Sequence, residues 1–140
     1  MPDPQNIALI IVKFFIPFLV GSLIFFSLVV APTTFINLDQ KNARIFIRNI
    51  FPKIYLWAHI LSLIIGLLII FYELILGSIV LLVSLGFLFS RQYLVKWINA
   101  VRDIKVKNKK QKKKFEFLHT LSVVIFISQI ICLSIIYFYV

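Results

Sequence analysis

One long apolar stretch decides the fold. It runs from Ile54 to Ser90 and reads IYLWAHILSLIIGLLIIFYELILGSIVLLVSLGFLFS, with Glu73 as its single charged side chain. One straight helix over this stretch would measure about 55 Å, whereas the hydrocarbon core of a bilayer is about 30 Å thick. The chain therefore has to fold back on itself near Tyr72 and Glu73. The sequence predicts a hairpin of two membrane spans over residues 54–71 and 76–90.

Two further apolar runs, residues 7–30 and 115–140, complete four predicted spans. Lys13 interrupts the first run near one end, where a lysine can extend its amine to the interface. The first run is longer than the apolar part of a signal peptide and lacks a basic residue before it, so we expect it to be retained. Pro17 is expected to kink this span, and Pro32 is expected to mark its end.

The composition excludes other classes of protein. Hydrophobic residues make up 61% of the 140 residues, the mean hydropathy is +1.03 and only 14% are charged, against about 25% in soluble domains. A single cysteine, Cys132, excludes a disulfide scaffold. We therefore predict an all-α fold, an antiparallel four-helix transmembrane bundle that forms a single domain over residues 1–140.

The basic residues predict the orientation. The connections 31–53 and 91–114 carry all but one of the 15 lysines and arginines, and an even number of spans places both connections on one face. By the positive-inside rule this face is cytoplasmic, in the cell (inner) membrane, with both termini outside. The first connection has apolar residues at helical spacing and basic residues on another face, which predicts an amphipathic cytoplasmic helix on the membrane surface. The apolar residues are Ala43, Phe46, Ile47, Ile50 and Phe51, and the basic ones are Lys41, Arg44 and Arg48.

The same apolar spacing recurs after residue 90, at Leu94, Trp97, Ile98 and Val101, and predicts that the third span continues past the interface. The segment Lys105–Lys114 then holds seven lysines. Because it lies between two spans and has no interleaved aromatic residues, we interpret it as a topology signal that contacts anionic headgroups, and expect no nucleic acid.

Few residues could carry chemistry. His59 and His119 are expected at similar shallow depth on different helices, where two imidazoles could hold a haem b iron. The alternative is that both are hydrogen-bonded packing residues. His119, Ser122 and Gln129 share one face of the last span, which indicates either interhelical hydrogen bonds or a path for a substrate or ion. No other metal-ligand cluster and no hydrolase or kinase motif is present.

Three stretches resemble a known family. They are Gly21 with Val30-Ala31-Pro32 and Phe35; Phe51-Pro52 with Tyr55; and Ile98-Asn99-Ala100-Val101-Arg102-Asp103 with Phe115-x-x-Leu118-His119-x-x-Ser122-Val123 and Gln129. They resemble the bacterial domain of unknown function 4149, which is related to the eukaryotic transmembrane protein 205. Lys96-Trp97 stands where the family often has Pro-Arg, Phe126 stands where it often has Asn, and His59 has no counterpart.

The resemblance implies a four-helix membrane protein without an established activity. It also implies that the motif residues Pro32, Phe51-Pro52, Arg102-Asp103, Phe115, His119 and Ser122 matter. Arg102 and Asp103 are neighbours on a helix and cannot face each other, so we expect each to pair elsewhere, Arg102 with a helix-end carbonyl. The predicted function is small-molecule or ion binding or transport, as a homo-oligomer or accessory subunit of a larger membrane complex. The alternative is a haem b redox protein that uses His119, with or without His59.

Overall fold

The computed structural model describes residues 3–140, and within this range every regular element is helical. Four continuous rods, Pro4–Asn37, Gln40–Ile70, Leu74–Arg102 and Lys109–Tyr139, are long and apolar enough to cross a membrane. This confirms the predicted all-α fold with four spans. The elements are α1 (Pro4–Phe25), η1 (Phe26–Val30), α2 (Ala31–Asn37), α3 (Gln40–Ile70), α4 (Leu74–Phe89), η2 (Ser90–Leu94), α5 (Val95–Arg102) and α6 (Lys109–Tyr139).

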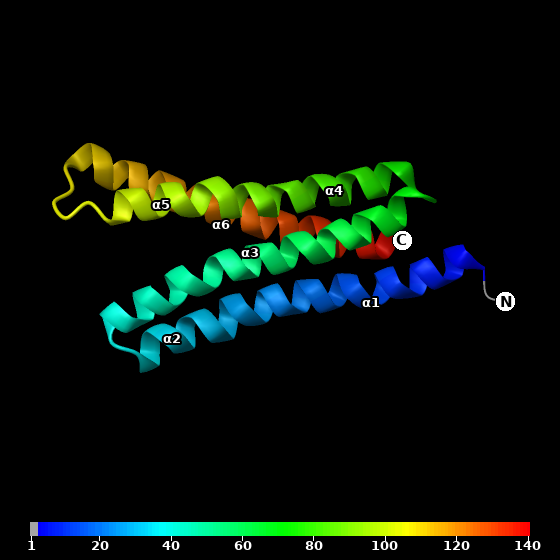
Figure 1. Ribbon diagram of the computed structural model, residues 1–140, viewed down its shortest axis with the longest axis horizontal. Helices are drawn as coiled ribbons and strands as arrows, with labels where there is room; N and C mark the ends of the chain where they lie inside the picture. The colour runs from blue at the N-terminus through cyan, green and yellow to red at the C-terminus, as the bar shows by residue number, and fades with distance from the viewer. Residues whose placement is uncertain (1–2) are drawn as a thin grey trace.

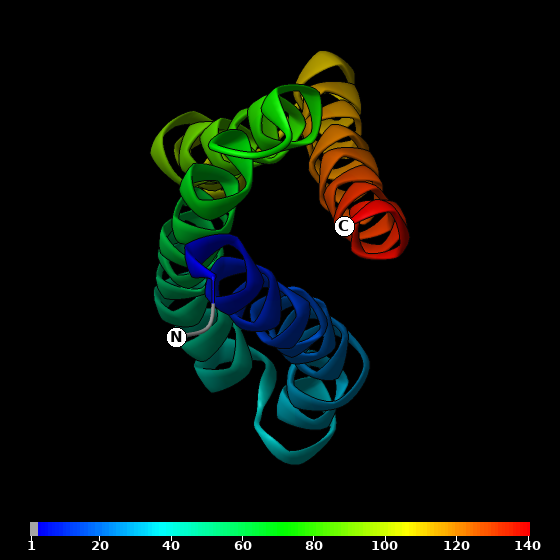
Figure 2. The same cartoon turned by 90° about the vertical axis from the view of Figure 1, so that its right-hand side faces the viewer.

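The rods run antiparallel (Figure 1). The α2–α3 and α5–α6 connections lie at one end of the molecule, called the basic end below. Both ends of the chain and the α3–α4 turn lie at the other, called the terminal end. Seen from the terminal end, α1, α3, α4 and α6 follow one another around an arc (Figure 2). The two lysine- and arginine-rich connections therefore share one end, as an even number of spans requires.

The first rod does not stop at Pro32, and the prediction of a helix end there is wrong. A π-helical turn, η1, precedes the proline, and the Ala31 N–H donates to the Phe26 carbonyl oxygen five residues back. Proline disrupts an α-helix because its ring presses on the carbonyl four residues earlier and it has no N–H to donate. The wider π turn accommodates Pro32 as one of the first residues of α2, so the helix continues to Asn37.

The amphipathic segment after the first span is helical, but it is not a separate helix on the membrane surface. It forms the first turns of α3, with Pro52 inside the helix, and the Asp39 side chain caps it by accepting from the Asn42 N–H. On its apolar face Ala43 and Ile47 are buried, where α2 packs against α3, whereas Phe46 is 41% exposed. Packing within the bundle therefore covers part of the face that was expected to meet lipid.

The second basic connection is also mostly helical. The third rod continues through η2 and α5 to Arg102, and α6 already begins at Lys109, so only residues 103–108 link them. Asn108 caps α6 in a capping box with Gln111: each side chain accepts a hydrogen bond from the backbone N–H of the other residue. Much of the lysine run therefore forms the first turns of a membrane helix.

The α3–α4 hairpin is the most extensive interface of the bundle. Ala58, Ser62 and Gly66 recur every fourth residue along α3 and are all buried. Small residues at this spacing let two membrane helices approach closely. On α4, a Cβ added to Gly77 would lie only 2.5 Å from the Ile70 Cα. The hairpin is thus closed by near backbone contact.

The outer helices complete the core differently along their length. From α1, the buried residues Val12, Ile16, Leu19 and Leu23 follow helical spacing and join the core over four turns. From α6, the fully packed core members are Leu133 and Ile136, which lie towards its C-terminal, terminal-end half. The bundle is therefore closed near the terminal end, whereas α6 takes little part in the core near the basic end.

Candidate functional site

A cavity of about 680 Å³ lies in the basic half of the bundle. One wall comes from the end of α1, from η1, α2 and α3, and the other from η2, α5 and α6. Figure 1 shows the same division, because α2 and the start of α3 lie apart from α5 and the start of α6. Pockets of about 300–1,000 Å³ hold drug-sized ligands, so this cavity is large enough for a small molecule.

Aromatic rings form much of the apolar wall. The rings of Phe26 and Phe51 meet edge to face with their centroids 5.3 Å apart, and Phe51 leads on to Tyr55 at 6.0 Å. Tyr55 in turn meets Phe126 of α6 edge to face at 6.2 Å. Phe126 thus joins an aromatic cluster across the cavity. This aromatic part of the wall can pack against the hydrocarbon chain of a ligand.

Polar side chains from four elements also line the cavity. They are Ser27 of η1, Arg48 and Tyr55 of α3, Asn99 and Arg102 of α5, and His119 and Ser122 of α6. Arg48, Asn99, Arg102 and His119 lie in the parts of their helices nearest the basic end. The cavity therefore has an apolar interior and a polar, cationic end.

An ion pair links the two walls. Arg48 of α3 donates to both carboxylate oxygens of Asp103, at 2.8 and 2.7 Å. This two-pronged geometry is the favourable one for arginine and carboxylate. The hydrogen bonds from Arg48 hold the pKa of the Asp103 carboxyl below its usual value. Because Asp103 follows α5 and Arg48 lies on α3, the pair connects the two sides across the basic end.

Arg102 has a different environment from the one predicted. It was expected to bind a helix-end carbonyl, but its guanidinium lies 5.5 Å from the centre of the Phe115 ring, in a cation–π contact. The helix-end carbonyls are used by Lys107, whose amine donates to the Arg102 and Ile104 carbonyl oxygens at 3.0 and 3.1 Å. His119 stacks almost parallel on the same Phe115 ring, at 6.1 Å.

Both π-helical turns border the cavity. In η2, as in η1, the first carbonyl accepts from an N–H five residues later, here from Val95 to Ser90. Phe26, Ser27 and Leu28 of η1 and Leu94 of η2 belong to the cavity wall. Such turns occur often at functional sites, since the extra residue redirects the side chains that follow. Two π-helical turns, in two different rods, therefore border one cavity, which makes this region the candidate functional site.

The structure brings many of the predicted site residues together. Seven of them line the cavity: Phe35, Phe51, Tyr55, Asn99, Arg102, His119 and Ser122. Two more support it from behind, Asp103 through Arg48 and Phe115 through Arg102 and His119. Pro52 lies beside the site, where its carbonyl oxygen accepts from the Arg91 Nε of η2 at 3.2 Å, and Pro32 follows η1.

His59 and Gln129 lie elsewhere. His59 faces α4, where its Nδ1 is 3.0 Å from the Ser84 carbonyl oxygen, and the Ser84 hydroxyl donates to the His59 carbonyl oxygen at 3.0 Å. Gln129 is buried against α4 and donates to the Val83 carbonyl oxygen at 3.1 Å. The structure thus does not bring His59 and His119 into one cavity, and of the polar face of α6 only His119 and Ser122 line it. Within residues 3–140, no group of three or more His, Cys, Asp or Glu side chains could hold a metal ion.

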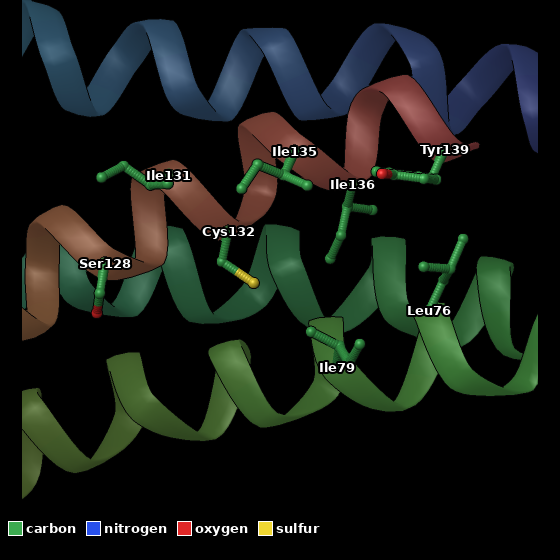
Figure 3. Close-up of a pocket in the computed structure, with 8 residues that line it drawn as sticks. All are labelled: Leu76, Ile79, Ser128, Ile131, Cys132, Ile135, Ile136 and Tyr139. Carbon is green, nitrogen blue, oxygen red and sulfur yellow. The ribbon is translucent and has the colours of Figure 1, made fainter.

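A second, smaller cavity of about 440 Å³ lies between α4 and α6 in the terminal half. Figure 3 shows its wall, which is formed by aliphatic side chains such as Ile79 and Ile131 together with Ser128, Cys132 and Tyr139. None of these side chains carries a charge at neutral pH. This cavity therefore lacks the combination of charge and apolar wall that distinguishes the larger one.

The family model for the domain of unknown function DUF4149 matches residues 14–107. The chain belongs to this family. The match covers α1 to α5 and so includes the cavity residues Phe35, Tyr55, Asn99 and Arg102, whereas His119 and Ser122 of α6 lie beyond it. Comparison with curated proteins and with solved structures gave no match. The DUF4149 chain is thus a multi-pass integral membrane protein whose family assigns no activity.

Sequence reasoning missed Arg48 as a site residue. It was assigned only to the polar face of an amphipathic segment, yet it lines the cavity and pairs with Asp103, 55 positions later. The expectation that Asp103 pairs away from its helical neighbour pointed to a distant cation. The other three basic residues of the first connection, Lys41, Arg44 and Lys53, were equally suitable by sequence, so only the three-dimensional arrangement selects Arg48.

Proposed function

We propose that this protein binds a small amphipathic molecule in the cavity at the basic end, as a binding or transport protein or as the accessory subunit of a larger membrane complex. The observation that supports this is the cavity itself, about 680 Å³ with an apolar interior and a polar end. Its wall collects residues from seven of the eight helical elements, including both π-helical turns. A bundle whose helices served only as an anchor would gain stability by packing this space closed.

The bilayer is the proposed source of the ligand. Several residues of the cavity wall are also exposed at the side of the bundle: Ile24 and Leu28 on the α1 side, and Val123 and Ile127 on the α6 side. Leu28 is 71% exposed and Ile127 is 50% exposed. Figure 2 places α1 and α6 at the two ends of the helical arc. The two helices also contact each other, and the exposed wall residues support an opening between the end of the first rod and α6. A molecule dissolved in lipid can enter by this route.

Monoolein, a neutral single-chain amphiphile, tests the binding site. Native mass spectrometry of the full chain released from detergent is expected to show one bound monoolein. Ser122→Trp fills the cavity from α6 and is expected to abolish this complex, whereas Thr120→Trp, an exposed position outside the wall, is the matched control and is expected to retain it. Equal binding by both variants would contradict the proposed site.

Haem b, held by His119 alone, is the competing occupant, because His119 lines the cavity. A visible spectrum of the purified protein separates the two. A Soret band that is lost in His119→Ala would replace the proposed function with a haem redox function. A preparation without a Soret band, from cells with ample haem, supports the amphiphile.

We also propose that the basic end faces the cytoplasm of the cell (inner) membrane, with both termini outside. The shared position of the two basic connections supports this orientation through the positive-inside rule. A reporter fused to the C-terminus, active only outside the cytoplasm, is expected to be active. Activity of a cytoplasm-specific reporter at that position would reverse the orientation.

The lysine run Lys105–Lys114 is proposed to contact anionic headgroups. Lys109, Lys110 and Lys112–Lys114 lie in the first turns of α6. Lys109 and Lys110 lie in the first turn, where a cation is unfavourable by about 0.3–1 kcal/mol because the helix dipole is positive there. Anionic lipid headgroups would compensate the charge of the lysines and the positive end of the helix dipole. Nanodiscs with anionic lipid are expected to stabilise the wild-type protein more than a variant with the five lysines replaced by glutamine, and equal stabilisation would contradict this contact.

A further inference from the structure

The charges around the larger cavity point to one kind of head group. Arg102 is half-buried in the cavity wall, and among the described residues its guanidinium has no hydrogen-bond acceptor and no carboxylate partner. A guanidinium has five N–H donors, so a half-buried one without acceptors has unused binding capacity. The cation–π contact with Phe115 orients the group but uses none of these donors in a conventional hydrogen bond.

Nearby charges leave the site positive. Arg44 and Arg48 both repel the charge of Arg102, and Asp103 is the one acidic group that attracts it. Yet both oxygens of Asp103 already accept from Arg48. The ion pair therefore neutralises Arg48 and leaves Arg102 as the uncompensated cation of the cavity.

Three further polar side chains lie at this end of the cavity. Asn99 lies one helical turn before Arg102 on α5, and His119 and Ser122 come from the neighbouring α6 in the same wall. The Ser122 hydroxyl already donates to the His119 carbonyl oxygen, so Asn99 and the His119 ring, which stacks on Phe115, are the side chains left to assist Arg102. Arginine supported by amide and imidazole groups is a typical environment for carboxylate and phosphate oxygens.

We infer that the cavity binds a single-chain anionic amphiphile, with its carboxylate or phosphate head on Arg102 and its hydrocarbon chain along the aromatic wall, leaving between α1 and α6. This inference rests on the proposed function and adds the charge of the head. The apolar wall explains why the ligand carries a chain, and the unpaired guanidinium explains why its head is anionic. The lateral opening lets the end of a long chain extend into lipid.

The test compares four probes on the full chain by competition in native mass spectrometry at pH 8.5. They are oleate, oleoyl lysophosphatidate, neutral monoolein and inorganic phosphate. We expect one or both anionic amphiphiles to bind at least tenfold more tightly than monoolein, and phosphate alone not to compete. The stronger of the two identifies the head as carboxylate or phosphate.

Variants assign the effect to Arg102. Arg102→Gln is expected to weaken the preferred anionic probe about tenfold and to leave monoolein unchanged, which also shows that the variant is folded. Lys96→Gln removes the same charge from an exposed position on α5 outside the cavity wall and is the matched control, with no expected change. Arg102→Lys keeps the charge without the planar fork and is expected to be intermediate.

The outcomes separate this inference from the proposed function. Equal binding of oleate, lysophosphatidate and monoolein overturns the anionic head but leaves an amphiphile site. If Lys96→Gln loses the preference for anionic probes as Arg102→Gln does, the preference arises from overall charge rather than from Arg102, and the inference is overturned. Competition by phosphate alone overturns the requirement for a chain. Failure of every probe, monoolein included, overturns the proposed function itself.

Discussion

Replacing Gly77 by alanine is expected to weaken the α3–α4 hairpin, although alanine is the better helix former. The added Cβ would lie 2.5 Å from the Ile70 Cα and 2.6 Å from the Ile70 backbone nitrogen. Both atoms belong to the backbone of α3, so no side chain can rotate away to relieve the contact. The two helices would have to separate at the turn.

The magnitude follows from comparison with Gly21→Ala. Alanine at either position gains the same helix propensity, about 0.5–1 kcal/mol relative to glycine. At Gly21, however, the new Cβ meets nothing within 4 Å, whereas at Gly77 it overpacks the interface. Overpacking typically costs about 1–3 kcal/mol. The propensity gain cancels between the two variants, so Gly77→Ala is expected to be about 1–3 kcal/mol less stable than Gly21→Ala.

Equilibrium unfolding in mixed micelles with increasing SDS measures this difference in the free energy of unfolding. Wild type, Gly21→Ala and Gly77→Ala are compared under identical conditions, with helical content followed by circular dichroism. Equal stability of the two variants would refute the reasoning, since it would mean that α3 and α4 do not approach as closely at Gly77 as the structure has them.

Three further changes test other contacts. Asp103→Asn removes the ion pair with Arg48 and is expected to lower thermal stability at pH 7. The pKa of Asp103 is lowered in the folded state. The stability advantage of the wild type is therefore present at neutral pH and is lost as the pH falls below the usual aspartate pKa of 3.8. An unchanged difference in melting temperature between pH 7 and pH 3 would contradict this. Ser84→Ala removes the hydroxyl that donates to the His59 carbonyl oxygen and is expected to cost about 0.6 kcal/mol in SDS unfolding, a typical value for a hydrogen bond between membrane helices. Gln129→Leu loses one hydrogen bond to α4 but also removes a buried amide oxygen that has no partner, so its free energy of unfolding is expected to stay within about 1 kcal/mol of wild type, and a larger loss would show that the oxygen is satisfied.

Apolar length and the position of charge were enough to predict the four spans. Both signals are local, because a stretch such as residues 54–90 has to be covered by lipid wherever its neighbours lie. The ends of the helices were harder to predict, because local signals do not show what the neighbouring elements do. Pro32 carries a strong local signal to end a helix, and a π-helical turn that the sequence does not announce overcomes it. Likewise, Ala43 and Ile47 meet a helix where the pattern alone indicated lipid.

The candidate site was predicted residue by residue but not as a cavity. The family resemblance singled out positions such as Tyr55, Asn99 and Arg102 without saying that they share a wall. The partnership of Arg48 with Asp103 depends on how far two rods separate at the basic end, which no spacing within one helix encodes. His59 illustrates the reverse case: it was expected at the depth of His119, but it meets Ser84, next to the Val83 carbonyl that Gln129 binds ten residues further along α6 than His119, so the two histidines lie at different levels of the bundle.

The lengths of the helices give the cavity a position relative to the bilayer. The rod Leu74–Arg102 has 29 residues and is about 43 Å long, about 13 Å more than the hydrocarbon core. If the α3–α4 turn lies at one surface of the core, Arg102 reaches the headgroup layer on the other side. Tyr55, by contrast, lies two helical turns beyond Arg48 along α3, in the direction of the core. With the turn placed in this way, the proposed amphiphile would lie across the boundary between headgroups and hydrocarbon, its anionic head at Arg102 and its chain along the aromatic wall.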